Sequence, residues 1–267
     1  MTQQFFGISK NTHMQEILKM VEKIAPLDVN LILIGERGTG KEWTARAIHQ
    51  TSLRVHKSFW PIDCDSISTD NFEKELFGFE SISREGVKIN PGAFEDAFGG
   101  TLLLNHIESL PHEIQRKLAR AIEYKTIHRV GDERTIPIDV RVIVTLGEQS
   151  DDLIRKGKLQ KDMFFRISPI VIELPPLRNR REDIPSLIER FISEMPQRQH
   201  HSVEGITPAA LELCLAHNWP GNIRNLRNAI EYASVLCPGS FIRPEDLPEY
   251  LHQNHSSKLS SLTSVNL

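Results

Sequence analysis

The sequence predicts an α/β fold in which a parallel sheet is sandwiched by helices and is followed by a smaller helical lid. Up to about residue 175, short apolar segments rich in β-branched residues alternate with segments of helical periodicity. This alternation is typical of parallel sheets covered on both faces. Beyond that point the strand signals stop and only helical periodicity continues.

The elements of the first part follow from local patterns. Residues 13–25 carry apolar side chains at helical spacing until Pro26 ends the helix. The apolar run 29–35 predicts a buried strand, and a glycine-rich turn and a helix over 41–53 follow it. We expect a β-hairpin over 126–140, with its turn at Gly-Asp-Glu. Four further strands are predicted at 59–64, 100–105, 140–146 and 169–174.

The second part predicts helices over 184–195, 207–218 and 222–236, and Thr207 followed by Pro208 is a typical helix start. The tail is polar and rich in serine, which indicates disorder. The expected units are an α/β subdomain over 1–175, a helical lid over 176–252 and a disordered tail over 253–267.

Composition narrows the class of protein. The 267 residues carry a formal charge of -3, so charge balance gives no reason to expect nucleic-acid binding. Three widely spaced cysteines form no metal-binding pattern and are expected to be buried thiols in a cytoplasmic protein. No apolar run approaches the roughly 20 residues of a membrane span. His200 and His201 lack further ligands nearby and are interpreted as exposed polar residues rather than a metal site.

A phosphate-binding loop is the strongest motif. The segment "GERGTGK" fits the GxxxxGK pattern and lies between a predicted strand and a predicted helix, as the motif requires. Glycines let backbone N–H groups surround phosphate oxygens, and the lysine adds a positive charge. The residue after the lysine is a glutamate instead of the usual Ser or Thr. The predicted nucleotide-binding residues are Gly35, Glu36, Arg37, Gly38, Thr39, Gly40, Lys41 and Glu42.

From about residue 6 to 250 the chain resembles the AAA+ domain of NtrC-like bacterial enhancer-binding proteins, which activate sigma-54 RNA polymerase. The resemblance rests on "GERGTGKE", "ELFG", "GGTLLL", "RVG", "DVRVI", "LPPLRNRREDI" and "WPGNIRNL", in this order. It implies a P-loop NTPase that binds ATP or ADP and forms a homo-oligomer, either a dimer or a hexameric ring. It also implies that Arg166 is an arginine finger and Arg224 the sensor arginine of the lid.

Departures from the family pattern concentrate on hydrolysis. The family has Asp-Glu after the "GGTLLL" strand, for magnesium and for the attacking water, whereas this chain has Asn105 and His106. By the same resemblance, Asp63 replaces the switch asparagine, Gly147 the sensor asparagine and Gln160 the first arginine finger. We therefore assign no catalytic residue, and we expect weak or absent Mg²⁺ binding.

Two interpretations of the strand end stay open. Asn105 and His106 are either polar residues that simply end a core strand, or His106 forms a reversed acid–base pair with Asp63. Should the protein nevertheless hydrolyse ATP, Glu108 is the first candidate for a substitute carboxylate.

The effector loop also departs from the family. Family members have "GAFTGA" after "ELFG", with a Thr and an aromatic residue that contact sigma-54. Here the expected surface loop is "SISREG", residues 81–86, about one residue shorter and without an aromatic residue. The "GAF" at 92–94 aligns with a later family position.

The predicted function is that of a regulatory AAA+ module of a bacterial transcription regulator. It binds nucleotide and assembles, while ATP hydrolysis and sigma-54 contact are impaired or lost. The alternatives are an active sigma-54-dependent ATPase and a regulator that responds to cyclic di-GMP. For the latter, Arg46 and residues 178–183 offer positive charges, although we interpret these as solvated. RNA polymerase is a candidate partner, and DNA contact would need a segment or partner outside this sequence.

Overall fold

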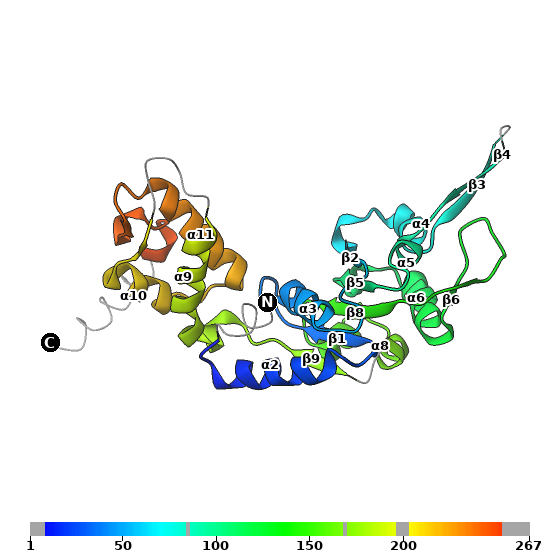
Figure 1. Ribbon diagram of the computed structural model, residues 1–267, viewed down its shortest axis with the longest axis horizontal. Coiled ribbons are helices and arrows are strands. Elements are labelled where there is room, and N and C mark those ends of the chain that lie inside the picture. Colours follow the sequence, from blue (N-terminus) through cyan, green and yellow to red (C-terminus); the bar gives the residue numbers. More distant parts are fainter. Residues whose placement is uncertain (1–8, 84–85, 168–169, 196–202, 253–267) are drawn as a thin grey trace.

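The computed structural model describes residues 9–83, 86–167, 170–195 and 203–252. Figure 1 shows two lobes side by side: a sheet with its helices, and a helical lobe formed by α9, α10 and α11. The hairpin of β3 and β4 projects from the sheet lobe, at the end away from the helical lobe (Figure 1). His200, His201 and the tail 253–267, for which we made predictions, lie outside the described residues.

The central sheet has the order β2-β5-β8-β1-β9, and all its strand pairs are parallel. This confirms the predicted fold class and places the carboxyl ends of β5, β8 and β1 next to one another. The five strands are β1 Leu31–Ile34, β2 Phe59–Asp63, β5 Thr101–Asn105, β8 Arg141–Leu146 and β9 Val171–Glu173.

Each face of the sheet packs on its own set of helices because successive side chains of a strand point to opposite faces. Ile32 and Leu104 belong to the core shared with α4 to α8. Leu31 and Leu103 belong to the core shared with α2 and α3. The helices are α2 Thr12–Ile24, α3 Lys41–Gln50, α4 Phe72–Phe77, α5 Ala93–Asp96, α6 His112–Tyr124, α7 Ser150–Arg155 and α8 Lys161–Ile167.

Two antiparallel hairpins interrupt the α/β pattern. β3, Phe79–Ser83, pairs with β4, Gly86–Asn90, so the expected loop "SISREG" is wrong for most of its length. Its first three residues continue a strand because they pair with residues 86–88 in a tight hairpin, which composition does not reveal. The predicted hairpin near 126–140 is confirmed by β6 Thr126–Ile127 and β7 Ile136–Pro137, with strands shorter than expected.

The helical lobe contains α9 Ile184–Glu194, α10 Pro208–Ala216 and α11 Asn222–Leu236, close to the predicted ranges. Two short parallel strands, β10 Gly205–Ile206 and β11 Phe241–Ile242, add a feature that was not predicted. Trp219 is fully buried in this lobe, and its indole N–H donates to the Cys214 carbonyl oxygen at 2.7 Å.

Residues 178–183 connect the lobes. Arg178 and Glu182 are exposed as we interpreted them, but two other charges of the segment are not solvated. Arg180 and Asp183 are 4% and 2% exposed. The Arg180 guanidinium donates to the Thr39 carbonyl oxygen at 2.6 Å. The Asp183 carboxylate accepts hydrogen bonds from the Ser9 hydroxyl and from the Lys10 and Asn11 backbone N–H groups. The segment is therefore a structural strap that ties the chain before α2 and the phosphate loop to the lid.

The cysteines agree with the composition argument. Cys64, Cys214 and Cys237 are buried and free of disulfides. Burial raises the pKa of the Cys214 thiol to about 12, so the thiol stays protonated at neutral pH. Within the described ranges, no helix is both long and apolar enough to cross a bilayer.

Candidate functional site

The glycine-rich loop after β1 opens into a cavity of about 350 Å³ between the sheet lobe and the lid. Such a position, at the carboxyl ends of parallel strands, is where open α/β sheets bind ligands. The predicted residues that line it are Arg37, Gly38, Gly40, Lys41, Glu42, Asp63, Asn105, His106 and Arg224. Sequence positions up to 187 residues apart therefore meet in one site.

Lys41 is the first residue of α3 and is only 6% exposed. Its ammonium group donates to the carbonyl oxygens of Gly35 at 2.5 Å and Glu36 at 3.1 Å. Burial lowers the pKa of Lys41 to about 8, and the negative charge of Glu108 is the strongest opposing influence. A phosphate group beside Lys41 would supply the negative charge that favours its protonated form.

The lid is joined to the phosphate loop through backbone groups. Gly38 has a φ of +80°, and a Cβ there would lie 2.2 Å from the Gly221 carbonyl oxygen. The Gly38 carbonyl oxygen accepts the Ile223 N–H at 2.9 Å. Glycine is therefore required at position 38 both for its backbone conformation and for the close approach of the lid.

Two polar side chains strengthen this contact. The fully buried Asn222 side chain donates to the Arg37 carbonyl oxygen at 2.9 Å and accepts the Leu177 N–H at 2.8 Å. Glu36 forms an ion pair with Arg178 at 2.5 Å, and the hydrogen bond from Arg178 lowers the pKa of Glu36. Glu36 therefore faces the lid strap and remains charged at neutral pH.

A second, smaller cavity of about 70 Å³ lies on the other side of the loop, beside Thr39 and Gly40. Its lining is mainly apolar and was not predicted from the sequence. The apolar lining residues are Met14, Leu18, Trp43, Ala47, Leu187 and Ile223. They come from α2, α3, α9 and α11, so only the assembled fold forms this cavity.

The end of β5 holds Asn105 and His106 through Thr145 of β8. The Thr145 hydroxyl donates to Asn105 Oδ1 at 3.2 Å and accepts the His106 N–H at 3.1 Å. His106 has a φ of +57°, a left-handed conformation that is uncommon outside glycine. The neutral amide oxygen of Asn105 is thus already engaged, and these two residues do not supply the anionic oxygens that suit Mg²⁺.

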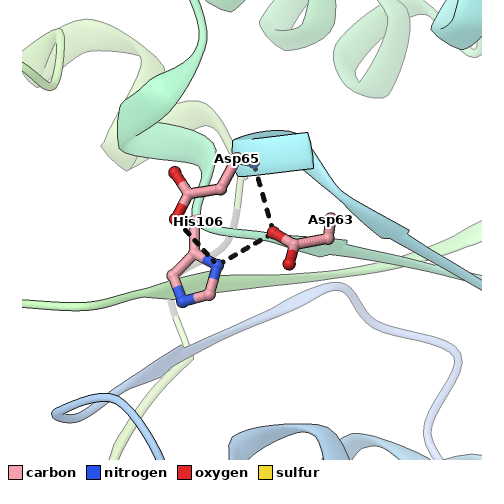
Figure 2. Close-up of side chains that lie close together, drawn as sticks. All are labelled: Asp63, Asp65 and His106. Carbon is pink, nitrogen blue, oxygen red and sulfur yellow. Dashed lines mark hydrogen bonds and ion pairs between the residues drawn. The ribbon is translucent and has the colours of Figure 1, made fainter. Parts of the chain in front are cut away.

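Asp63, Asp65 and His106 form a cluster at the mouth of the cavity, shown in Figure 2. His106 Nδ1 lies 3.0 Å from an Asp63 oxygen and 3.7 Å from an Asp65 oxygen, so the predicted contact between Asp63 and His106 is present. Asp65 also contacts the Arg37 guanidinium and the Ser109 hydroxyl. One ligand atom from each cluster residue lies within 4.8 Å of the others, a spacing that could hold a metal ion, although protein groups already engage each residue.

Glu108 and Gly147 meet behind this cluster. Glu108 lies in a short 3₁₀ helix, Ile107–Ser109, and its Oε1 accepts the Gly147 N–H at 2.7 Å. A Cβ at Gly147 would lie 2.9 Å from that oxygen. The sequence singled out both residues separately, but their contact depends on the pairing of β5 with β8.

Arg166 and Gln160 are outside the lining of this cavity. Arg166 lies on α8 and pairs with Glu123 at 2.6 Å and Asp162 at 3.0 Å. The Gln160 N–H donates to Gln115 Oε1 at 3.0 Å, which ties the start of α8 to α6. Neither residue therefore joins the phosphate loop of the same chain.

Comparison with known families gives the same assignment as the motifs. The family described as "Sigma-54 interaction domain" matches residues 7–173, and the "AAA+ ATPase lid domain" matches residues 178–263. The chain belongs to the sigma-54 interaction domain family. The resemblance to NtrC-like AAA+ domains is thereby confirmed.

Individual members of the family cover almost the whole chain. The transcriptional regulatory protein ZraR of Salmonella typhimurium is 38% identical over 92% of this chain and 56% of its own length. The regulatory protein AtoC of Escherichia coli is 37% identical over 92% of this chain and 54% of its own. The chain thus spans about half the length of these curated relatives.

The fold agrees with solved structures of the family. NtrX from Brucella abortus in complex with ATP has a TM-score of 0.84 and 32% identity, over 92% of this chain and 55% of NtrX. Its complex with ADP has a TM-score of 0.81 and 31% identity over the same shares. The parallel sheet and the helical lid are therefore those of the family.

Proposed function

We propose that the chain is the nucleotide-binding regulatory module of a transcription regulator, with residues 1–175 holding the nucleotide and residues 176–252 acting as its lid. The observation that carries the proposal is the convergence of Lys41, Arg37 and Arg224 on one cavity at the phosphate loop. Three positive side chains beside a glycine-rich phosphate loop suit a polyphosphate. The adjoining apolar cavity suits a purine base, and the NtrX complexes with ATP and ADP support nucleotides as the ligand class.

In this proposal, hydrolysis is absent or very slow. Asn105 and the backbone of His106 are engaged by Thr145, and the His106 ring faces Asp63. Asn105 and His106 then offer no free carboxylate for a magnesium ion or an attacking water, and Glu108 has one oxygen held by the Gly147 N–H and the other buried. Losing a single preorganised electrostatic contributor can lower a rate roughly 100-fold or more.

Assembly and polymerase contact are the remaining parts of the proposal. Arg166 lies away from its own phosphate loop, as expected for a residue that completes the site of a neighbouring copy. The β3–β4 hairpin projects from the sheet lobe (Figure 1), but the segment 81–86 lacks the Thr and aromatic residue of the family loop. We therefore expect a nucleotide-dependent assembly that does not capture sigma-54.

The test measures binding and turnover on the same preparation. Calorimetry with ADP and with ATP should show binding, while phosphate release with ATP and Mg²⁺ should stay at the level of a protein-free control. Sustained magnesium-dependent release would overturn the loss of hydrolysis, and absence of binding to both nucleotides would overturn the site itself. Titration with cyclic di-GMP tests the alternative ligand.

A grafted variant tests the sigma-54 part of the proposal. The variant Asn105→Asp with His106→Glu is compared with the same variant carrying a transplanted "GAFTGA" loop. We expect sigma-54 capture, in the presence of an ATP transition-state mimic, only after transplantation. Capture by the double variant alone would contradict the role given to the hairpin sequence.

A further inference from the structure

Glu108 occupies the space that a side chain at position 147 would need. Gly147 follows β8, next to the phosphate loop that follows β1, and a Cβ on it would lie 2.9 Å from Glu108 Oε1. The carboxylate is held there by the Gly147 N–H at 2.7 Å. A carboxylate from the segment after β5 therefore fills the place that a side chain just after β8 would take.

The second carboxylate oxygen of Glu108 has no partner. Oε2 is buried and makes no hydrogen bond to any described residue. Buried polar atoms without a partner are rare in native proteins, and a charged one is costly. Glu108 also lies next to the loop that holds Lys41. The Leu146 carbonyl oxygen, adjoining Gly147, accepts the Gly35 N–H at 3.2 Å, and the Gly35 carbonyl oxygen accepts a hydrogen bond from the Lys41 ammonium group at 2.5 Å. The negative charge of Glu108 favours the charged form of Lys41.

The position of the Glu108 charge affects which nucleotides bind, because nucleotides differ in their number of phosphates. The lysine of a phosphate loop reaches the phosphates farthest from the nucleoside. A charge beside Lys41 therefore acts most strongly on a third phosphate. Between two partly buried charges, such repulsion changes a binding affinity by roughly tenfold or more.

We propose that Glu108, held in place by Gly147, makes the cavity selective for nucleoside diphosphates over nucleoside triphosphates. The inference rests on the proposed nucleotide site and names its ligand class. Glu108 is a specificity residue because its charge lies next to the loop residue that holds Lys41, the side chain that contacts the last phosphates. The third phosphate of ATP would add negative charge near this carboxylate, whereas ADP adds less and keeps the contacts with Lys41 and the loop.

Calorimetry with ADP and ATP, each in EDTA and in Mg²⁺, tests this proposal on the intact chain. Glu108→Gln removes the charge and retains an oxygen that can accept the Gly147 N–H. We expect the intact chain to bind ADP about tenfold or more tightly than ATP, and Glu108→Gln to strengthen ATP binding about tenfold while leaving ADP within about twofold. Glu113→Gln, on the exposed surface of α6, is the matched control and should change neither affinity.

A second variant approaches the same contact from the other side. Gly147→Ala places a methyl group against Glu108 Oε1 and should displace the carboxylate, so it should relax the preference for ADP as well. Equal affinities for ADP and ATP in the intact chain, or a ratio that Glu108→Gln leaves unchanged, would overturn the proposal and leave the nucleotide site standing. Failure of both nucleotides to bind would overturn the site and the selectivity together.

Discussion

The two sides of the cavity are built in different ways. On the side of the phosphate loop, backbone hydrogen bonds and buried charges join Gly38, Arg180 and Asn222 across the two lobes. On the side of the strand ends, Asp63 and His106 form a partly exposed pair at the rim. The loop side is tied to the fold by these buried contacts, whereas the strand-end pair is more exposed. We therefore expect the strand ends to change without disturbing the fold, and binding to be separable from hydrolysis.

The largest expected effect tests how firmly the loop side is built. Asp183→Ala removes a 2% exposed carboxylate and leaves the donors of Ser9, Lys10 and Asn11 without their acceptor. We expect a loss of about 3 kcal/mol in unfolding free energy, because hydrogen bonds to charged groups are the strong ones. Thermal unfolding should shift down by roughly 6 °C or more. The neighbouring exposed Glu182→Ala should stay within about 0.5 kcal/mol, and equal shifts in both variants would contradict the strap.

Lys41→Ala tests the ligand contacts of the loop side. Removing the buried ammonium group should weaken nucleotide binding by about 1–3 kcal/mol, the range for a charge-assisted contact. On the strand-end side, His106→Ala should change binding by less than about 0.5 kcal/mol. Calorimetry on both variants measures the difference. A larger loss with His106→Ala than with Lys41→Ala would reverse the comparison.

The pH dependence of binding gives a smaller effect. Burial lowers the pKa of Lys41 from 10.5 to about 8, and bound phosphates favour its charged form. Binding therefore takes up a proton above about pH 8, and affinity should fall by up to about tenfold per pH unit there. Calorimetry in buffers of different ionisation enthalpy measures this uptake. Lys41→Arg should abolish the dependence because a guanidinium stays charged. If nucleotide binding by Lys41→Arg still depended on pH, a group other than Lys41 would be responsible for the dependence.

The lowered pKa also has a consequence for the free protein. The folded state binds the Lys41 proton less tightly than the unfolded state does, so the contribution of this lysine to stability increases as pH rises from about 8 toward 10.5. Binding and stability should thus respond to pH in opposite directions over this window. Urea unfolding without ligand, compared between the intact chain and Lys41→Arg, checks the sign.

The smallest expected effect belongs to the strand-end pair. Asp63 is 51% exposed in its side chain, so its contact with His106 is solvated and screened. Asp63→Asn should cost between about 0.2 and 1 kcal/mol in unfolding free energy. Urea unfolding measures it, with Asp70→Asn as an exposed control. A loss above about 2 kcal/mol would show that the strand ends are as integrated as the loop side.

Local patterns in the sequence predicted most of the fold. Buried strands, the phosphate loop and the lid helices each carry a signal within about fifteen residues, and Gly38 and Lys41 lie where the motif places them. The contact of Asp63 with His106 was one of the two interpretations left open for the strand end, because the family resemblance relates the ends of those two strands.

The remaining features depend on partners distant in the chain. The burial of Arg180 and Asp183 is set by Thr39 and by residues before α2, more than 140 positions away, so their charges alone suggest solvation. The first part of "SISREG" is an exception, because it becomes a strand by pairing with the nearby residues 86–88, and it was missed because its polar composition suggests a loop. The meeting of Glu108 with Gly147 requires the sheet order, which no local pattern contains.

The hydrogen bond from the Ile223 N–H to the Gly38 carbonyl oxygen makes one amide of the lid a reporter of the phosphate loop. Its proton can exchange with solvent only when the loop and the lid separate, because the bond joins backbone to backbone across the two lobes. The exchange rate of this single amide therefore measures how often the site opens. Occupancy of the cavity becomes readable, without any label on the nucleotide, from the protection of a residue that belongs to the lid.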